Sequence, residues 1–288
     1  MKKIFMAVIA LMMTINASAQ FYIYYSSGTV VKIDSISLVA PKETPSIGVG
    51  VFSVSDTKKV KFSKGNLQYH PANDEWRFAE SQLDYIGSAN RNISFSYNGW
   101  IDLFGWSTND TYFGVSTSDD YKNDYLGDFI DWGVNQIDSD SSNIFRTLTY
   151  GEWNYILNNR SKANQLRGIA RVAGVNGLII LPDDWSCPSE IIFRAGTGNI
   201  ESMDAYAQYQ TFTIQEWLIL ETTGAVFLPA TGFRYRQGTD EVQLNGRYWS
   251  ATAYDNNSVL TLFFDSGEIG FIEQLRAFAG AVRLVTDL

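Results

Sequence analysis

The chain has 288 residues, of which 22 are Lys or Arg, 31 are Asp or Glu, one is His and one is Cys. The formal charge of −9 excludes a nucleic-acid binder, because phosphates require a basic surface. A single His leaves little scope for proton transfer or transition-metal binding, and a single Cys excludes an intramolecular disulfide and a Cys-rich zinc site. The 18 Phe, 16 Tyr and 8 Trp exclude a disordered chain and predict a sizeable core.

The first 20 residues have the pattern of a secretory signal peptide. Lys2 and Lys3 precede an apolar run at 4–13, and Ala17-Ser18-Ala19 forms a cleavage signal. A membrane anchor is disfavoured, because a helix that spans a bilayer needs about 20 apolar residues. We therefore predict that residues 1–19 are a cleaved signal peptide. The protein would be exported to the periplasm, the cell surface or the medium, without membrane insertion.

The rest of the chain divides into an N-terminal stub and linker at 20–50 and one domain at 51–288. Residues 21–39 alternate apolar and polar side chains around a Ser-Ser-Gly turn, which favours a short hairpin or an extended stub. Residues 40–45 have the Pro-rich composition of a linker. No second linker follows, and about 240 residues is an ordinary size for one β-rich domain.

Short strand signals dominate this domain. They lie at 59–62, 66–69, 76–79, 247–253, 259–264 and 281–285. The clearest hairpin joins 170–175 to 178–181 through Asn176-Gly177, because this dipeptide supplies the positive φ of a two-residue turn.

Two helices interrupt the strands. Thr149 and Thr213 each begin the pattern Thr-x-x-Glu-Trp, which is a capping box. The apolar faces expected at i, i+3 and i+4 are Trp153, Ile156 and Leu157 in the first helix, and Ile214, Trp217 and Leu218 in the second. The predicted fold class is α+β, with two helices packed on twisted antiparallel sheets.

Several aromatic segments resemble a known family. They are Phe-Ser-Lys-Gly-Asn-Leu-Gln-Tyr at 62–69, Trp-Ile-Asp-Leu-Phe-Gly-Trp at 100–106, Asp-Trp-Gly-Val-Asn at 131–135, and Gly-Arg-Tyr-Trp-Ser-Ala-Thr at 246–252 with Gly-Ala-Val-Arg-Leu-Val at 280–285. Together they are similar to secreted bacterial C-type-lectin-like domains. This group includes the Fibrobacter succinogenes major paralogous domain, formylglycine-generating-enzyme-like proteins and the variable proteins of diversity-generating retroelements. The resemblance implies a C-type-lectin-like fold with long loops over 51–288.

The candidate ligand-binding residues lie between the C-terminal motifs. They are Tyr254, Asp255, Asn256, Asn257, Phe271, Glu273 and Gln274. Tyr supplies rigid contact area and Asn supplies adaptable hydrogen bonds, a composition typical of recognition surfaces. The alternative is that these segments are ordinary solvated turns. In the flanking motifs, Trp249 is expected in the core and Arg283 in a structural ion pair.

Enzymatic chemistry has little support. Formylglycine-generating activity would, by the resemblance, need a reactive cysteine pair, and only Cys187 is present. The related iron-dependent oxygenases bind iron through several histidines, and only His70 is present. The sequence does not show whether two carboxylates form a catalytic pair of the glycosidase type. With 31 acidic residues, some lie near one another in the chain by chance, and a catalytic pair is recognised only by the distance between its carboxylates in space.

Calcium is the one metal that the composition leaves open, since oxygen ligands are abundant. Asp138 and Asp140, within the acidic stretch 109–143, begin like a calcium loop. The loop then has Asn143 where an EF-hand needs Gly, and Thr149 where it needs Glu. The alternative is a solvated acidic loop.

These observations predict a non-catalytic ligand-binding module without a cofactor, acting as a monomer. Its ligand would be an extracellular protein or a glycan, contacted by the C-terminal segment. One alternative is a structural or adhesive surface component of the fimbrial-tip or matrix type. A carbohydrate-active enzyme has less support.

Overall fold

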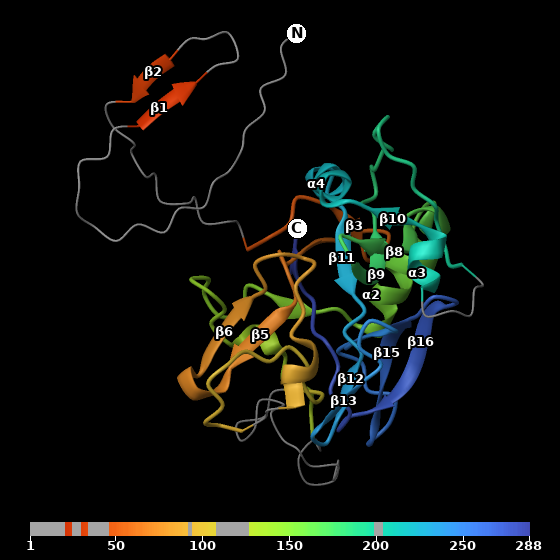
Figure 1. The fold of residues 1–288 in the computed structure, drawn as a ribbon. Coiled ribbons are helices and arrows are strands. Elements are labelled where there is room, and N and C mark those ends of the chain that lie inside the picture. The colour runs from red at the N-terminus through yellow and green to blue at the C-terminus, as the bar shows by residue number, and fades with distance from the viewer. Residues whose placement is uncertain (1–20, 25–29, 34–45, 92–93, 108–126, 199–203) are drawn as a thin grey trace. The chain divides into compact units, whose positions relative to one another are not determined.

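The computed structural model describes residues 21–24, 30–33, 46–91, 94–107, 127–198 and 204–288. The chain divides into two units, Met1–Thr44 and Pro45–Leu288 (Figure 1). In the first unit, β1 (Phe21–Tyr24) pairs antiparallel with β2 (Val30–Ile33), so the N-terminal hairpin is confirmed.

The second unit begins before residue 51, where the sequence placed the domain boundary. The Gly48 N–H donates to the Phe62 carbonyl (2.8 Å), and Ile47 forms a bridge with Ser63. Residues 46–50 are therefore part of the folded unit and not of a linker, because their backbone extends a sheet edge. No helix among the described residues has the length and apolar character needed to cross a bilayer.

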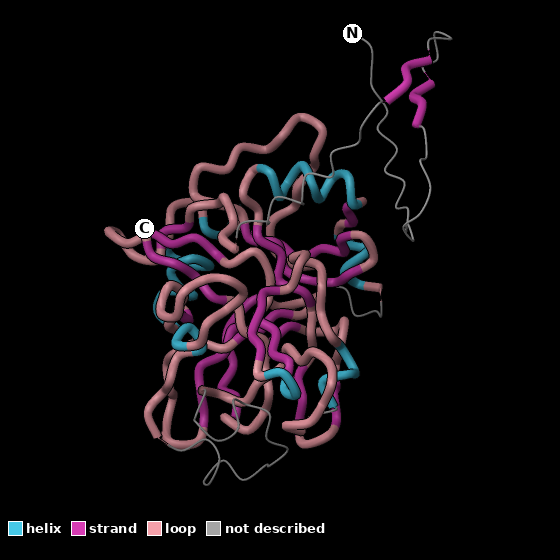
Figure 2. Tube along the Cα trace, turned by 90° about the vertical axis from the view of Figure 1, so that its left-hand side faces the viewer, coloured by secondary structure: helices cyan, strands magenta, loops and turns pink. Residues whose placement is uncertain are grey.

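In the second unit, the described residues form three sheets and two ribbons (Figures 1 and 2). The first sheet has the order β3 (Phe52–Ser53), β4 (Lys59–Phe62), β17 (Leu284–Asp287) and β7 (Arg146–Thr147). The second has the order β10 (Thr211–Phe212), β8 (Arg167–Val172), β9 (Val175–Ile180) and β11 (Val226–Pro229). The third has the order β14 (Gly246–Tyr248), β15 (Ser258–Phe264) and β16 (Ile269–Leu275). The ribbons are β5 (Leu67–His70) with β6 (Glu75–Phe78), and β12 (Phe233–Tyr235) with β13 (Gly238–Asp240).

The helices are short. Among the described residues they are α2 (Tyr150–Asn154), α3 (Ala205–Tyr209) and α4 (Ile214–Thr222). Helix α2 continues into the π-helix η4 (Tyr155–Asn159). The 3-10 turns are η1 (Pro71–Asn73), η2 (Gly87–Arg91), η3 (Trp132–Val134) and η5 (Ala163–Gln165). The α+β class is confirmed, although several elements differ from the sequence prediction. The sequence missed α3, and β10 pairs with β8 in parallel.

Both capping boxes are present, at Thr149 and Thr213. The predicted face of the first helix is correct, because Trp153, Ile156 and Leu157 are fully buried. The predicted face of the second helix is correct at Trp217 and wrong at Ile214 and Leu218.

In α4 the buried residues are Trp217 and Leu220, whereas Ile214 is 41% exposed and Leu218 is 50% exposed. The helix therefore packs on the sheet mainly through the side chains of Trp217 and Leu220. Two large aliphatic side chains remain on its solvent face, which spacing alone did not reveal.

The hairpin of β8 and β9 has its turn three residues earlier than predicted. Val172 pairs with Val175, so the two-residue turn is Ala173-Gly174, and both residues have positive φ. Asn176 lies inside β9, where its side-chain amide donates to the Gln243 carbonyl (2.9 Å). A long-range contact, and not a turn, therefore explains this asparagine.

Arg283 is buried, as the sequence predicted, but its partners are amides. Its Nη2 donates to the Gln82 Oε1 (2.6 Å) and its Nη1 to the Asn66 Oδ1 (3.3 Å). Gln82 in turn donates to the Glu221 carboxylate (2.9 Å). Burial lowers the pKa of Arg283 to about 10. The expected ion pair is therefore wrong as a direct contact, because Gln82 lies between the two charges.

Candidate functional site

Residues 254–258 form a turn, which we call the recognition turn. A hollow of about 470 Å³ lies beside it, and we call this the Arg276 hollow. It is lined by Trp106, Gly127, Asp128, Phe129, Ala251, Ala253, Asp255, Asn256 and Arg276. Two alanines leave room for a ligand, while carboxylate, amide and guanidinium groups supply polar contacts. This mixture of apolar surface and a few fixed polar groups is typical of small recognition sites.

The Asp255 carboxylate holds the recognition turn in one conformation. Its Oδ1 accepts from the Asn257 N–H (2.7 Å), the Ser258 N–H (2.8 Å) and the Ser258 hydroxyl (2.8 Å). These hydrogen bonds, led by the one from Asn257, lower the pKa of Asp255. The Tyr254 N–H also donates to the Ser258 carbonyl (2.9 Å). The turn is therefore ordered before any ligand arrives, which reduces the entropy cost of binding.

Arg276 fixes the same turn from the other side. Its backbone N–H donates to the Asn257 carbonyl (2.9 Å), and its Nη2 donates to the Asp255 carbonyl (2.9 Å). The guanidinium lies 4.3 Å from the centre of the Trp106 ring, which is a cation–π distance. Trp106 also stacks on Phe129, with 4.9 Å between ring centres. Burial lowers the pKa of Arg276, and the charge of Asp255 opposes this shift.

The structure brings only part of the predicted set together. Asp255 and Asn256 line the hollow, and Tyr254, 59% exposed, is adjacent to them in the turn. Asn257 is half-buried and serves the turn through its backbone.

The other predicted residues belong to β16, a strand that the sequence did not predict. Phe271 is half-buried and contacts the Tyr150 ring edge-on, with 4.8 Å between centres. Glu273 is exposed and accepts from the Ser258 hydroxyl (2.8 Å). Gln274 is only 2% exposed and donates to the Phe278 carbonyl (3.2 Å), so its prediction as a contact residue is wrong. Alternation along a strand turned this side chain inward.

Sequence reasoning missed the far wall of the hollow. Trp106 and Phe129 come from segments more than 120 residues before the recognition turn, and no local pattern connects them to it. One usable signal existed. Arg276 stands in apolar surroundings and needs partners when buried, which marks it as part of a tertiary cluster.

Of the two calcium candidates, Asp138 already contacts other protein groups, whereas the Asp140 Oδ2 is buried without a hydrogen-bond partner among the described residues. The Asp138 carboxylate accepts from the Phe78 N–H (3.3 Å) and lies 3.3 Å from the Lys64 ammonium. Asp110, Asp119, Asp120 and Asp124 lie outside the described residues. Within the described part of the chain, no three His, Cys, Asp or Glu side chains gather in a metal-binding arrangement.

We expect metal removal to leave the fold intact, because Asp138 already has protein partners. Thermal melts in 1 mM EDTA and in 1 mM calcium chloride, measured by circular dichroism, should agree within a few degrees. A melting temperature that falls in EDTA and recovers with calcium would contradict this expectation and would indicate a structural calcium site.

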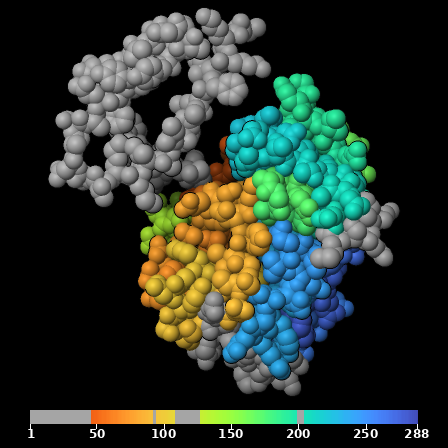
Figure 3. All heavy atoms as spheres, viewed as in Figure 1, coloured from red at the N-terminus to blue at the C-terminus, as the bar shows by residue number. Residues whose placement is uncertain are grey.

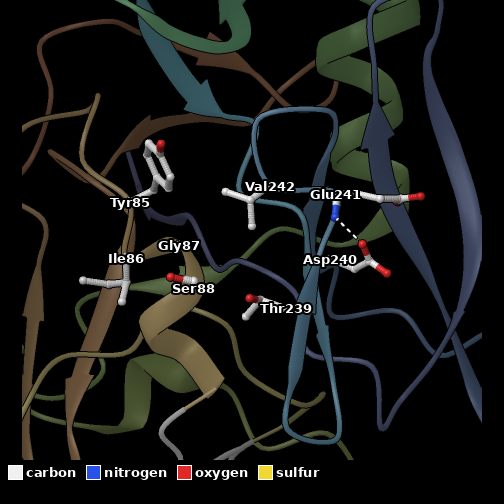
Figure 4. Close-up of a pocket in the computed structure, with 8 residues that line it drawn as sticks. All are labelled: Tyr85, Ile86, Gly87, Ser88, Thr239, Asp240, Glu241 and Val242. Carbon is white, nitrogen blue, oxygen red and sulfur yellow. Dashed lines mark hydrogen bonds between the residues drawn. The ribbon is translucent and has the colours of Figure 1, made fainter. Parts of the chain in front are cut away.

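A second cleft, of about 650 Å³, lies between η2 and the β12–β13 ribbon. Its lining residues are Tyr85, Ile86, Gly87, Ser88, Thr239, Asp240, Glu241 and Val242. In Figure 4, Val242 extends toward the wall that carries Tyr85, whereas the side chains of Asp240 and Glu241 extend to the opposite side of the ribbon. Glu241 also accepts from Arg247 Nη2 (2.7 Å), so its charge is already compensated.

Asp102 fixes one wall of this cleft from inside the protein. Its carboxylate accepts from the Ile86 N–H (2.9 Å) and from the Asn90 side-chain amide (2.8 Å). It is fully buried, and burial raises its pKa to about 6, although both hydrogen bonds oppose the rise. The folded state therefore binds the proton more tightly than the unfolded chain, in which an Asp pKa is about 3.9.

This raised pKa predicts how stability changes with pH. The contribution of Asp102 to stability is fully present below pH about 4 and is lost as the pH rises through about 6. Asp102→Asn should remove this dependence. The unfolding free energy of wild type relative to the variant should rise by about 2 to 3 kcal/mol between pH 7.5 and pH 4. Urea unfolding of both proteins across this range measures the difference, and parallel pH profiles would contradict the prediction.

No family model, curated protein or solved structure matches this chain.

Proposed function

We propose that this protein is an exported, non-catalytic ligand-binding module on a C-type-lectin-like scaffold. The ligand, an extracellular protein or a glycan, contacts the C-terminal segment at the Arg276 hollow, and the module acts as a monomer. The observation that carries the proposal is the preordered turn, in which Asp255 and Arg276 hold Asn256 at the edge of the hollow.

The packing of the aromatic motifs supports the scaffold part of the proposal. The Trp249 Nε1 donates to the Phe104 carbonyl (2.7 Å), and the Trp106 Nε1 donates to the Ser250 carbonyl (2.8 Å). The Phe104 N–H donates to the Gly280 carbonyl (2.9 Å). The segments 100–106, 246–252 and 280–285, each of which resembles the family in sequence, are thus hydrogen-bonded to one another. Such contacts are expected of motifs that stabilise one common fold.

A ligand screen followed by paired substitutions tests the proposal. Glycan arrays and arrays of host surface proteins identify the ligand, and its affinity is then measured for Tyr254→Ala and Asn256→Ala. Each change should weaken binding about tenfold or more, because truncation of a central contact residue commonly costs 1 to 2 kcal/mol or more. The melting temperature should stay within a few degrees of wild type, since both side chains are exposed.

Asn164→Ala is the matched control, because Asn164 is exposed and lies outside the lining of the hollow. Asp255→Ala is unsuitable as a probe, since it would disorder the turn and affect binding indirectly. Unchanged affinity in both test variants would place the site elsewhere on the molecule.

A further inference from the structure

Strand β16 is the last strand of its sheet in the part of the chain that the structure describes. The sheet order is β14, β15, β16, and β16 pairs with β15 over seven residues, from Ser258↔Leu275 to Phe264↔Ile269. Figures 1 and 3 show the dark blue C-terminal region, to which β16 belongs, on the outer flank of the compact unit.

Two backbone hydrogen bonds establish which residues of β16 face away from β15. The Asp265 N–H donates to the Glu268 carbonyl (3.0 Å), and the Arg276 N–H donates to the Asn257 carbonyl (2.9 Å). Hydrogen-bonded pairs alternate along an antiparallel ladder, so the even-numbered residues of β16 bond to β15. The N–H and C=O groups of the odd-numbered residues point to the outer edge; these residues are Ile269, Phe271, Glu273 and Leu275.

The ends of this outer edge are occupied and its middle is open. The Ile269 carbonyl accepts from Arg167 Nη1 (3.4 Å), and the Leu275 carbonyl accepts from the Phe278 N–H (2.9 Å). Among the described residues, the outward backbone groups of Phe271 and Glu273 have no hydrogen-bond partner. Two donors and two acceptors are thus arranged as the template for one more strand.

The sequence of β16 does not block such pairing. Exposed sheet edges are usually protected by Lys, Pro or a bulge, and β16 reads Ile-Gly-Phe-Ile-Glu-Gln-Leu in an unbroken register. Phe271 and Ile272 are half-buried and lie on opposite faces of the strand, so an added strand would cover apolar surface on both faces. The one charged side chain of the strand, Glu273, is exposed and acidic.

We propose that the outer edge of β16 binds an extended peptide segment of the partner protein as an added strand, with a Lys or Arg side chain near Glu273. The charge of the edge favours a basic segment, since Glu268 and Glu273 are both exposed and the chain carries −9. The same charge disfavours a second copy of this chain. The inference rests on the proposed function and deepens it, because Arg276, which lines the hollow, directly follows β16 in the chain.

Two substitutions at one position separate backbone pairing from side-chain contact. Random twelve-residue peptides are displayed and selected on the intact protein, and the strongest peptides are measured by fluorescence polarisation. Glu273→Ala and Glu273→Pro both remove the carboxylate, but only proline also removes the outward N–H. Proline is tolerated on edge strands at such positions, so the ladder with β15 should persist.

The expected result is that Glu273→Pro binds the selected peptides at least tenfold more weakly than Glu273→Ala, with similar melting temperatures. If Glu273→Pro unfolds the protein, hydrogen exchange of the wild type tests the backbone pairing instead. A bound peptide should slow exchange at the Phe271 and Glu273 amides. Failure to select any peptide, equal affinity of both variants without slowed exchange, or a dimer of the free protein in light scattering would overturn the inference. A loss of ligand binding in Asn256→Ala, with no effect of Glu273→Pro, would overturn the β16 proposal alone and leave the proposed function in place.

Discussion

Replacement of Trp249 by alanine is expected to destabilise the compact unit severely. The side chain is 1% exposed and packs in a cluster with Phe104, Val282 and Leu284. Its Nε1 donates to the Phe104 carbonyl, and its own carbonyl accepts from Trp153 Nε1 (3.3 Å). Truncation of a buried Trp to Ala costs about 3 to 5 kcal/mol, a large share of the 5 to 15 kcal/mol that stabilises a typical domain.

Urea unfolding followed by tryptophan fluorescence measures this loss. Trp185→Ala is the matched control, because Trp185 is only half-buried and its Nε1 donates to the hydroxyl of Thr223 (3.2 Å) near the surface. The control should lose about 1 to 2 kcal/mol. A similar small loss in Trp249→Ala would show that the cluster relaxes around the cavity, contrary to this expectation.

Gly177→Ala should also be severely destabilising, with a loss of about 3 kcal/mol or more. A Cβ at this position would lie 2.4 Å from the Leu228 carbonyl oxygen and 2.4 Å from the Phe227 ring. Because the carbonyl belongs to the neighbouring strand β11, relief of the clash requires the two paired strands to separate. Residue 177 is therefore glycine because β11 approaches closely.

Gly174→Ala is the comparison in the same hairpin. A Cβ there meets nothing within 4 Å, but φ is +91°, so the cost is backbone strain of about 1 to 2 kcal/mol. Thermal melts of both variants should therefore show the larger decrease for Gly177→Ala. The reverse order would mean that the turn, and not the approach of β11, limits the stability of the hairpin.

Some features of this protein were determined by local sequence. Both capping boxes form as predicted, because their hydrogen bonds join residues three positions apart. The strand at 59–62 and the burial of Trp249 were also correct, since alternation and large aromatic size are local signals of burial. Asp255 and Asn256, which the sequence singled out for their polar character, lie in a turn that borders the Arg276 hollow.

Other features were decided only by tertiary structure. The turn of the β8–β9 hairpin lies at Ala173-Gly174, whereas Asn176, which the sequence predicted in the turn, bonds to Gln243, 67 residues away. Ile214 and Leu218 are exposed because α4 packs on the sheet through Trp217 and Leu220. The position of the sheet relative to the helix determines which helix face is buried.

The candidate site shows the same division. A strand pattern of alternating exposure turned Gln274 inward, and the far wall of the hollow came from Trp106 and Phe129. Spacing along the chain reports which residues neighbour one another within a helix or strand. Which elements then meet depends on the packing of the whole unit, and that information is spread over residues far apart in sequence.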